Sequence, residues 1–207
     1  MGIVSKVEDV FKDELDLIED TIIKNFVINC FNELTPDYFW DVPCSTSGKY
    51  YPQISLGPGG LVRHVKYAIW WGIELMKCWP GLELTAIDEI IAALLLHDLK
   101  KNGEKLDSKG FPTLKDASAV HGPYLGKQIR EKFVDAIKNE RIDRIVCAIE
   151  GHMGVWTSSQ YKNMKPENQT VDSNLYDVCM LVHLADYCAS RKVDEAIASI
   201  REKAKNV

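Results

Sequence analysis

Apolar residues recur along this chain at the three- and four-residue spacing of amphipathic helices, and the alternation typical of β-strands is nearly absent. The pattern therefore predicts an all-α fold. No internal repeat is evident. The predicted helices span residues 5–33, 60–79, 85–101, 122–138, 140–152 and 174–204.

Two long segments separate these helices: DVPCSTSGKYYPQISLGPGG, residues 41–60, and MGVWTSSQYKNMKPENQTVDSN, residues 153–174. Loops of this length are uncommon inside a compact domain and are often functional. Neither carries a phosphate-binding motif, because GPGGLV departs from the dinucleotide fingerprint and TSGKYY lacks the full P-loop spacing.

The stretch IIAALLLHDLKK runs a core helix into a histidine and an aspartate. Thr85 followed by Asp88 resembles a capping box and predicts where this helix begins. Asp98 continues the apolar stripe that contains Leu94, and His97 lies about 100° around the helix on a side that is also apolar. We therefore expect both polar side chains to be buried. A buried carboxylate is costly unless it is paired or binds a metal.

Polar groups interrupt the apolar faces of other helices too. His64, His152 and Asp186 each extend an apolar stripe, and His183 lies one turn before Asp186. Taken alone, such a histidine is more often a hydrogen-bonded core residue than a ligand. All five histidines of the chain, however, lie between residues 64 and 183, together with two inward carboxylates. Convergent histidine and aspartate side chains are how helical proteins bind clusters of divalent ions.

Composition narrows the classes of function. The 207 residues, 46% of them hydrophobic, suffice for one sizeable core. A net charge of −5 with a pI near 5.6 argues against a partner such as long duplex DNA. We expect no membrane segment and a cytoplasmic location, since no apolar run approaches membrane-spanning length. The six cysteines form no CxxC pair and are assigned no chemistry.

The order of these groups carries a family resemblance. GGLVRH, ALLLHDLKK, HGPYLG, AIEGHMG and LVHLADYCASR follow one another as in the HD-domain metal-dependent phosphohydrolases, which the chain resembles over about residues 57–191. The resemblance implies an HD-domain helical bundle, residues 57–207, preceded by an N-terminal helix and loop extension, residues 1–56.

The resemblance further implies two divalent metal ions, held by His64, His97, Asp98, His121, His152 and Asp186. His121 and His152 would help to hold the second ion, and Asp98 would bridge the two. Imidazole and carboxylate ligands suit Mn, Fe, Ni or Zn. His121 precedes Gly-Pro at a predicted helix start, where a helix-capping surface histidine is an equal alternative. His183 is expected to support a ligand or to pack in the core.

Basic residues near these ligands are candidates for binding phosphate. The resemblance places a lysine that faces the substrate phosphate at Lys101, although a role at the helix terminus applies to Lys100 and Lys101 alike. Arg63 and Arg191 flank metal ligands in the sequence and could bind phosphate through both guanidinium branches. A solvated or salt-bridged arginine is the commoner outcome for both.

The segment after His152 combines aromatic rings with positive charge. Trp156, Tyr161, Lys162 and Lys165 together suit a nucleobase attached to phosphate. Alternatively, Trp156 only anchors the segment on the core.

The expected function is the hydrolysis of phosphate esters of nucleotides or short single-stranded oligonucleotides by metal-activated water, with Asp98 and Lys101 as catalytic residues. HGPYLG and LADYCASR are similar to the HD-type diadenosine tetraphosphate hydrolases, and GGLVRH, GHMGVW and LVHLAD to the HD module of bacterial 3′→5′ exoribonucleases. The alternative is a catalytically silent HD module that binds a nucleotide and signals. The sequence leaves a homodimer open.

Overall fold

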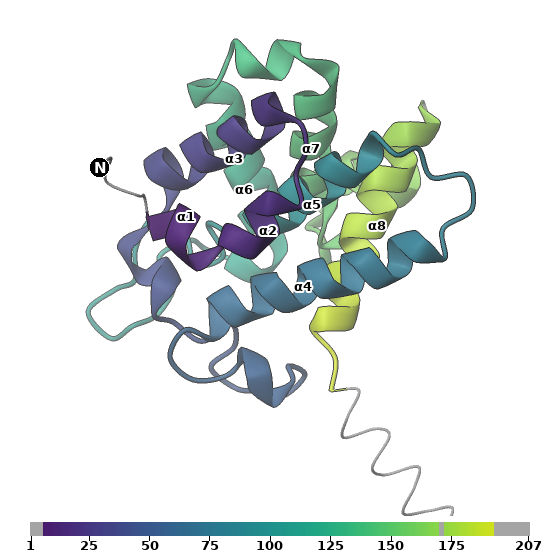
Figure 1. Cartoon of the computed structure of the whole chain (residues 1–207). Coiled ribbons are helices and arrows are strands. Elements are labelled where there is room, and N and C mark those ends of the chain that lie inside the picture. Colours follow the sequence, from purple (N-terminus) through teal and green to yellow (C-terminus); the bar gives the residue numbers. More distant parts are fainter. Residues whose placement is uncertain (1–5, 170–171, 193–207) are drawn as a thin grey trace, which may run out of the picture.

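The computed structural model describes residues 6–169 and 172–192, and this part of the chain is all-α, as predicted, with no strand (Figure 1). No helix among these residues is long and apolar enough to cross a membrane. The α-helices are α1 (Lys6–Val10), α2 (Lys12–Asp16), α3 (Thr21–Leu34), α4 (Gly60–Lys77), α5 (Ala86–Leu96), α6 (Ala117–Lys132), α7 (Glu140–Gly151) and α8 (Ser173–Ala189). Short 3₁₀ helices connect them: η1 (Asp37–Trp40), η2 (Gln53–Ser55), η3 (Ala136–Lys138), η4 (Gly154–Trp156), η5 (Ser159–Met164) and η6 (Pro166–Asn168).

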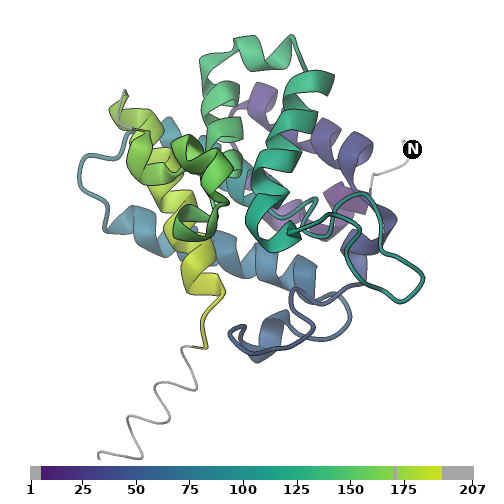
Figure 2. The same ribbon diagram turned by 180° about the vertical axis from the view of Figure 1, so that it is seen from behind.

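Helix α5 is the centre of the bundle. It packs against α3, α4, α7 and α8, and α4 crosses α8 beside it (Figures 1 and 2). Ten of its eleven residues are buried, because apolar side chains project from it in nearly every direction. The polar residues at its two ends are therefore carried into the interior.

The single N-terminal helix predicted over residues 5–33 is wrong. The structure has three shorter helices there, interrupted at Phe11 and between Leu17 and Asp20. Asp20 caps α3 by accepting hydrogen bonds from the backbone of Ile22 and Ile23, at 2.8 and 3.2 Å. Phe11 packs on Phe31, with ring centroids 5.4 Å apart, and both belong to the main core.

The helix around the HD dipeptide also differs from its prediction. It ends at Leu96 rather than at residue 101, so His97 and Asp98 lie at and beyond its last turn. Thr85 makes no side-chain capping bond, and Asp88 instead accepts hydrogen bonds from the backbone of Glu19 and Asp20, at 3.1 and 2.9 Å. The capping-box interpretation is therefore wrong, because the Asp88 side chain hydrogen-bonds the segment before α3 and not the start of its own helix.

Of the remaining helices, α4 and α7 follow their predictions closely, whereas the bounds of α6 differ. α6 begins at Ala117, five residues before the predicted start, so His121 lies within the helix and is no surface cap. It ends at Lys132, and η3 follows after a break. The helix predicted over 140–152 is confirmed as α7. α8 covers Ser173–Ala189, and residues 193–204 of its prediction lie outside the described residues.

Small residues bring α6 close to α7. A Cβ atom added to Gly122 would lie 2.6 Å from the carbonyl oxygen of Ile149, and one added to Gly126 would lie 2.2 Å from Cγ of Glu150. Only glycine permits this approach of the two helices. This close approach places His121 of α6 next to His152, which follows α7.

Candidate metal centre

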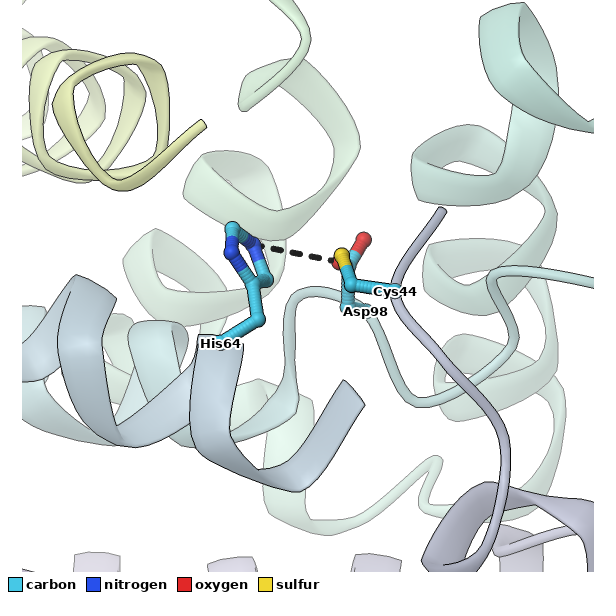
Figure 3. A group of neighbouring side chains, drawn as sticks. All are labelled: Cys44, His64 and Asp98. Atoms are coloured by element: carbon cyan, nitrogen blue, oxygen red, sulfur yellow. Dashed lines mark ion pairs between the residues drawn. The ribbon is translucent and has the colours of Figure 1, made fainter. Parts of the chain in front are cut away.

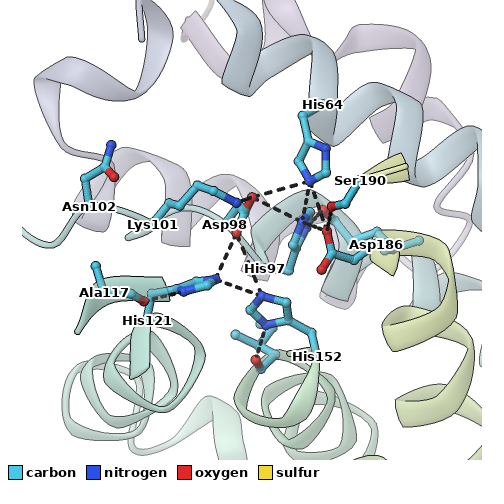
Figure 4. Close-up of polar contacts among 12 residues, drawn as sticks. His64, His97, Asp98, Lys101, Asn102, Ala117, His121, His152, Asp186 and Ser190 are labelled. Atoms are coloured by element: carbon cyan, nitrogen blue, oxygen red, sulfur yellow. Dashed lines mark hydrogen bonds and ion pairs between the residues drawn. The ribbon is translucent and has the colours of Figure 1, made fainter. Parts of the chain in front are cut away.

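The structure gathers all six predicted ligands into one buried cluster (Figure 4). The cluster draws one or two residues from each of α4, the end of α5, α6, the end of α7 and α8. The relative exposure of these residues is 0–1%, except for Asp186, at 9%. The six predicted ligands are His64, His97, Asp98, His121, His152 and Asp186.

Backbone carbonyls fix the tautomers of three of the histidines. The Nδ1–H groups of His97, His121 and His152 donate to the carbonyls of Leu94, Ala117 and Ile149, each at 2.7 Å. A carbonyl can only accept, so Nδ1 carries the proton and, in the neutral ring, Nε2 keeps a lone pair. Those Nε2 atoms all point into the cluster.

Two pairs of Nε2 atoms face each other in the cluster. Nε2 of His121 lies 2.9 Å from Nε2 of His152, and Nε2 of His97 lies 3.4 Å from Nε2 of His64. Burial lowers the pKa of His152 to about 3, helped by His121 and His97, so its ring is neutral. Two facing lone pairs repel unless a proton or a metal ion lies between them.

Asp98 divides the cluster into two groups. Its Oδ2 lies 3.4 Å from Nε2 of His64 and 3.6 Å from Nε2 of His97, while its Oδ1 lies 3.0 Å from Nε2 of His121 and 3.8 Å from Nε2 of His152. The ligand atoms of the first two histidines and Asp186 lie within 4.8 Å of one another, as do those of Asp98, His121 and His152. Each oxygen of Asp98 thus faces its own pair of imidazoles, so Asp98 could contribute one oxygen to each group if both held an ion.

Hydrogen bonding within the protein leaves part of the cluster unsatisfied. Nδ1 of His64 and Oδ1 of Asp98 are buried without a hydrogen-bond partner. Such atoms are rare in folded proteins and call for an explanation. The donor set, four imidazoles and two carboxylates, fits first-row divalent ions such as Mn, Fe, Ni or Zn.

The carboxylates are charged despite their burial. Burial raises the pKa of Asp98, but the nearby Lys101 and His97 lower it by a larger amount, so the pKa lies well below its usual range. Asp186 behaves in the same way, through hydrogen bonds with His64 and His97. For His64, burial lowers the pKa, but Cys44 and Asp186 raise it by more, to about 10.

The neighbouring lysines Lys100 and Lys101 pair with different carboxylates. Lys101 Nζ lies 2.5 Å from Oδ2 of Asp98 and 3.4 Å from the hydroxyl of Tyr51. Lys100 instead pairs with Glu104, away from the cluster. Lys101 is therefore the lysine that faces the candidate centre, as expected from the sequence.

A cavity of about 590 Å³ opens beside Asp186. The guanidinium of Arg191 lies in its wall, 4.2 Å from the ring centre of Tyr187 and 5.2 Å from that of Trp156. Trp156 stacks on Tyr187, with centroids 5.6 Å apart. Nε of Arg191 is buried without a hydrogen-bond partner. The cavity thus combines an aromatic wall with a cation.

Other predicted substrate-binding residues lie elsewhere. Arg63 donates to the carbonyls of Ile54, Pro58 and Leu56, at 2.7–2.8 Å, so all three guanidinium nitrogens tie down the preceding loop instead of facing the cluster. Tyr161 and Lys162 lie in η5 and line neither cavity beside the cluster.

Three further residues lie next to the cluster: His183, for which a supporting role was expected, and Tyr51 and Cys44, for which none was. His183 donates from Nδ1 to the carbonyl of His152, at 2.7 Å, and supports that ligand. The Tyr51 ring packs edge-on to His64, and the Cys44 thiol lies near His64 and Asp98. The last two come from the loop before α4, whose path the periodicity of the sequence does not specify.

No family model, curated protein or solved structure matches this chain.

Proposed function

We propose that this protein is a metal-dependent phosphohydrolase or phosphodiesterase of the HD-domain type, acting on nucleotides or short single-stranded oligonucleotides. The observation that carries the proposal is the convergence of imidazole lone pairs and two charged carboxylates on one buried point beside a cavity. Two divalent ions held there would activate a water molecule and polarise phosphoryl oxygens.

Two basic residues support a phosphorylated substrate. Lys101 lines a second cavity, of about 430 Å³, and Tyr51 lines both this cavity and the one that contains Arg191. The first cavity also contains Asp186, and Lys101 pairs with Asp98, so each cation lies in a cavity wall next to a carboxylate of the cluster or pairs with one. A phosphoryl group bound at the centre would lie within reach of both charges, which stabilise negative charge as it develops.

The aromatic wall supports a nucleotide over a simple phosphate ester. Trp156 is 47% exposed, although it stacks on Tyr187, so part of its ring faces solvent at the cavity. Stacking on an aromatic ring is worth about 1–3 kcal/mol per base and tolerates any base. This geometry favours recognition of a nucleobase without selecting which one.

Metal analysis and hydrolysis assays test the proposal. Protein purified without chelator should contain at least one divalent transition ion per chain, or take up Mn, Fe, Ni or Zn, and should then hydrolyse bis(p-nitrophenyl) phosphate or a nucleotide. Lys101→Ala should lower kcat/KM by about 10²-fold, whereas Lys100→Ala, the neighbouring lysine paired with Glu104, should leave it within about two-fold. Nucleotide binding without turnover under every metal would favour the silent signalling module, and failure to bind any metal would overturn the metal-dependent hydrolase.

A further inference from the structure

A cysteine lies against the candidate metal centre. Figure 3 shows the Cys44 thiol beside His64 and Asp98, and the ligand atoms of the three residues lie within 4.8 Å of one another. Cys44 is 6% exposed and lines the cavity that contains Lys101. Among the described residues, no other cysteine belongs to such a group.

The backbone holds this thiol in place. The N–H of Cys44 donates to the carbonyl of Ser55 at 3.0 Å, and the N–H of Leu61 in α4 donates to the carbonyl of Val42 at 3.0 Å. A Cβ atom on Gly60 would lie 2.3 Å from the Ser55 oxygen, so the loop and the start of α4 are in direct contact. The helix that carries His64 and the loop that carries Cys44 therefore form one unit.

Charge balance favours a thiolate at this position. Two divalent ions would bring four positive charges, and only two carboxylates, Asp98 and Asp186, belong to the ligand groups of the described residues. The Lys101 ammonium adds a further positive charge, 2.5 Å from Asp98. Uncompensated charge in a buried site is costly, and a thiolate would neutralise one unit of it.

We propose that Cys44 is a thiolate ligand of the ion held by His64 and Asp98, so that this ion has nitrogen, oxygen and sulfur donors. The thiol gives its proton to solvent as the metal–sulfur bond forms. A sulfur donor shifts the preference of the centre from Mn towards softer ions such as Zn, Fe or Co. The inference rests on the metal binding proposed above but not on phosphate ester hydrolysis.

Cobalt spectroscopy tests the inference on the full chain. Wild-type protein loaded with Co²⁺ should show a sulfur-to-cobalt charge-transfer band in the near ultraviolet. Cys44→Ser should lose the band while elemental analysis still finds bound cobalt. Cys188→Ser, which alters a partly buried cysteine two residues after Asp186, should keep it.

A measurement on the wild-type protein removes any dependence on how the variant folds. X-ray absorption of the zinc-loaded protein should show sulfur scattering at about 2.3 Å, the usual Zn–S distance. Bound metal without sulfur scattering, or a cobalt band that persists in Cys44→Ser, would overturn the role of Cys44 and leave the proposed function standing. A wild-type protein that binds neither ion would overturn both.

Discussion

Buried carboxylates lie at both ends of helix α5, and their hydrogen-bond partners differ between the two ends. At the first end, both oxygens of Glu89 accept hydrogen bonds from Arg141 and Arg144, at 2.8–2.9 Å. Both oxygens of Asp88 accept backbone N–H groups. Arginine is always protonated, so this end is satisfied by permanent donors.

At the second end, the partners of Asp98 are mainly imidazoles. Their Nε2 atoms face one another and the carboxylate, and Oδ1 of Asp98 accepts no hydrogen bond. Lys101 pairs with Oδ2 of Asp98, so the difference lies in Oδ1, which is buried among imidazoles without a hydrogen-bond donor, whereas every oxygen of Asp88 and Glu89 has one. A buried charged group left in this state is a candidate for metal binding. Burial alone does not distinguish the two ends, but the identity of the partners does.

The largest expected effect comes from removing the acid at the second end. Asp98→Ala should lose both ions and reduce turnover by about 10⁴-fold or more, because the bridging oxygens serve both groups. Elemental analysis and hydrolysis of bis(p-nitrophenyl) phosphate measure this. Asp88→Asn, at the first end, should keep wild-type metal content, and equal metal loss in both variants would contradict the distinction.

Removal of a ligand from the second group should have a smaller effect. His152→Ala or His121→Ala should remove one ion and lower kcat by about 10²-fold or more, with an unchanged circular dichroism spectrum. The first group, which contains His64, His97 and Asp186, should keep its ion. If both variants retain wild-type metal content and turnover, the centre holds one ion only.

Breaking the first end should affect stability and not metal binding. Glu89→Gln should lower the free energy of unfolding by about 2–3 kcal/mol, at or below the lower end of the range for fully buried pairs, because solvent reaches both arginines. Urea denaturation measures the change. The metal content should stay at the wild-type value, and a loss of metal would show that the two ends of α5 are coupled.

Removing the metal should give the smallest effect. At a free metal concentration ten times the Kd, binding stabilises the folded state by about 1.4 kcal/mol, so a chelator should lower the Tm of the wild type. Asp98→Ala should show no such shift. A Tm that does not respond to metal in the wild type would indicate that the ions do not bind the folded chain.

The burial of several polar side chains could be predicted from the sequence because their residue types interrupt apolar stripes, which is a local property. His64, His97 and His152 all lie where that periodicity places them. The break of the N-terminal helix and the use of Asp88 were missed because they depend on each other across 68 residues, through the N–H of Asp20. The positions of Cys44 and Tyr51 were likewise not predictable, since the loop path is set by Arg63 and Gly60.

The ends of α5 and α7 are built alike. Each helix is followed by a histidine, His97 or His152, whose Nδ1–H bonds a carbonyl three residues earlier. That carbonyl belongs to the last turn, where helices leave acceptors without a helical partner. One hydrogen bond thus closes the helix and also fixes the tautomer of the ligand. A histidine placed directly after a buried helix therefore has a fixed ring orientation and a free Nε2 atom. A natural or designed helical scaffold could gain an oriented metal ligand in this way without a new loop.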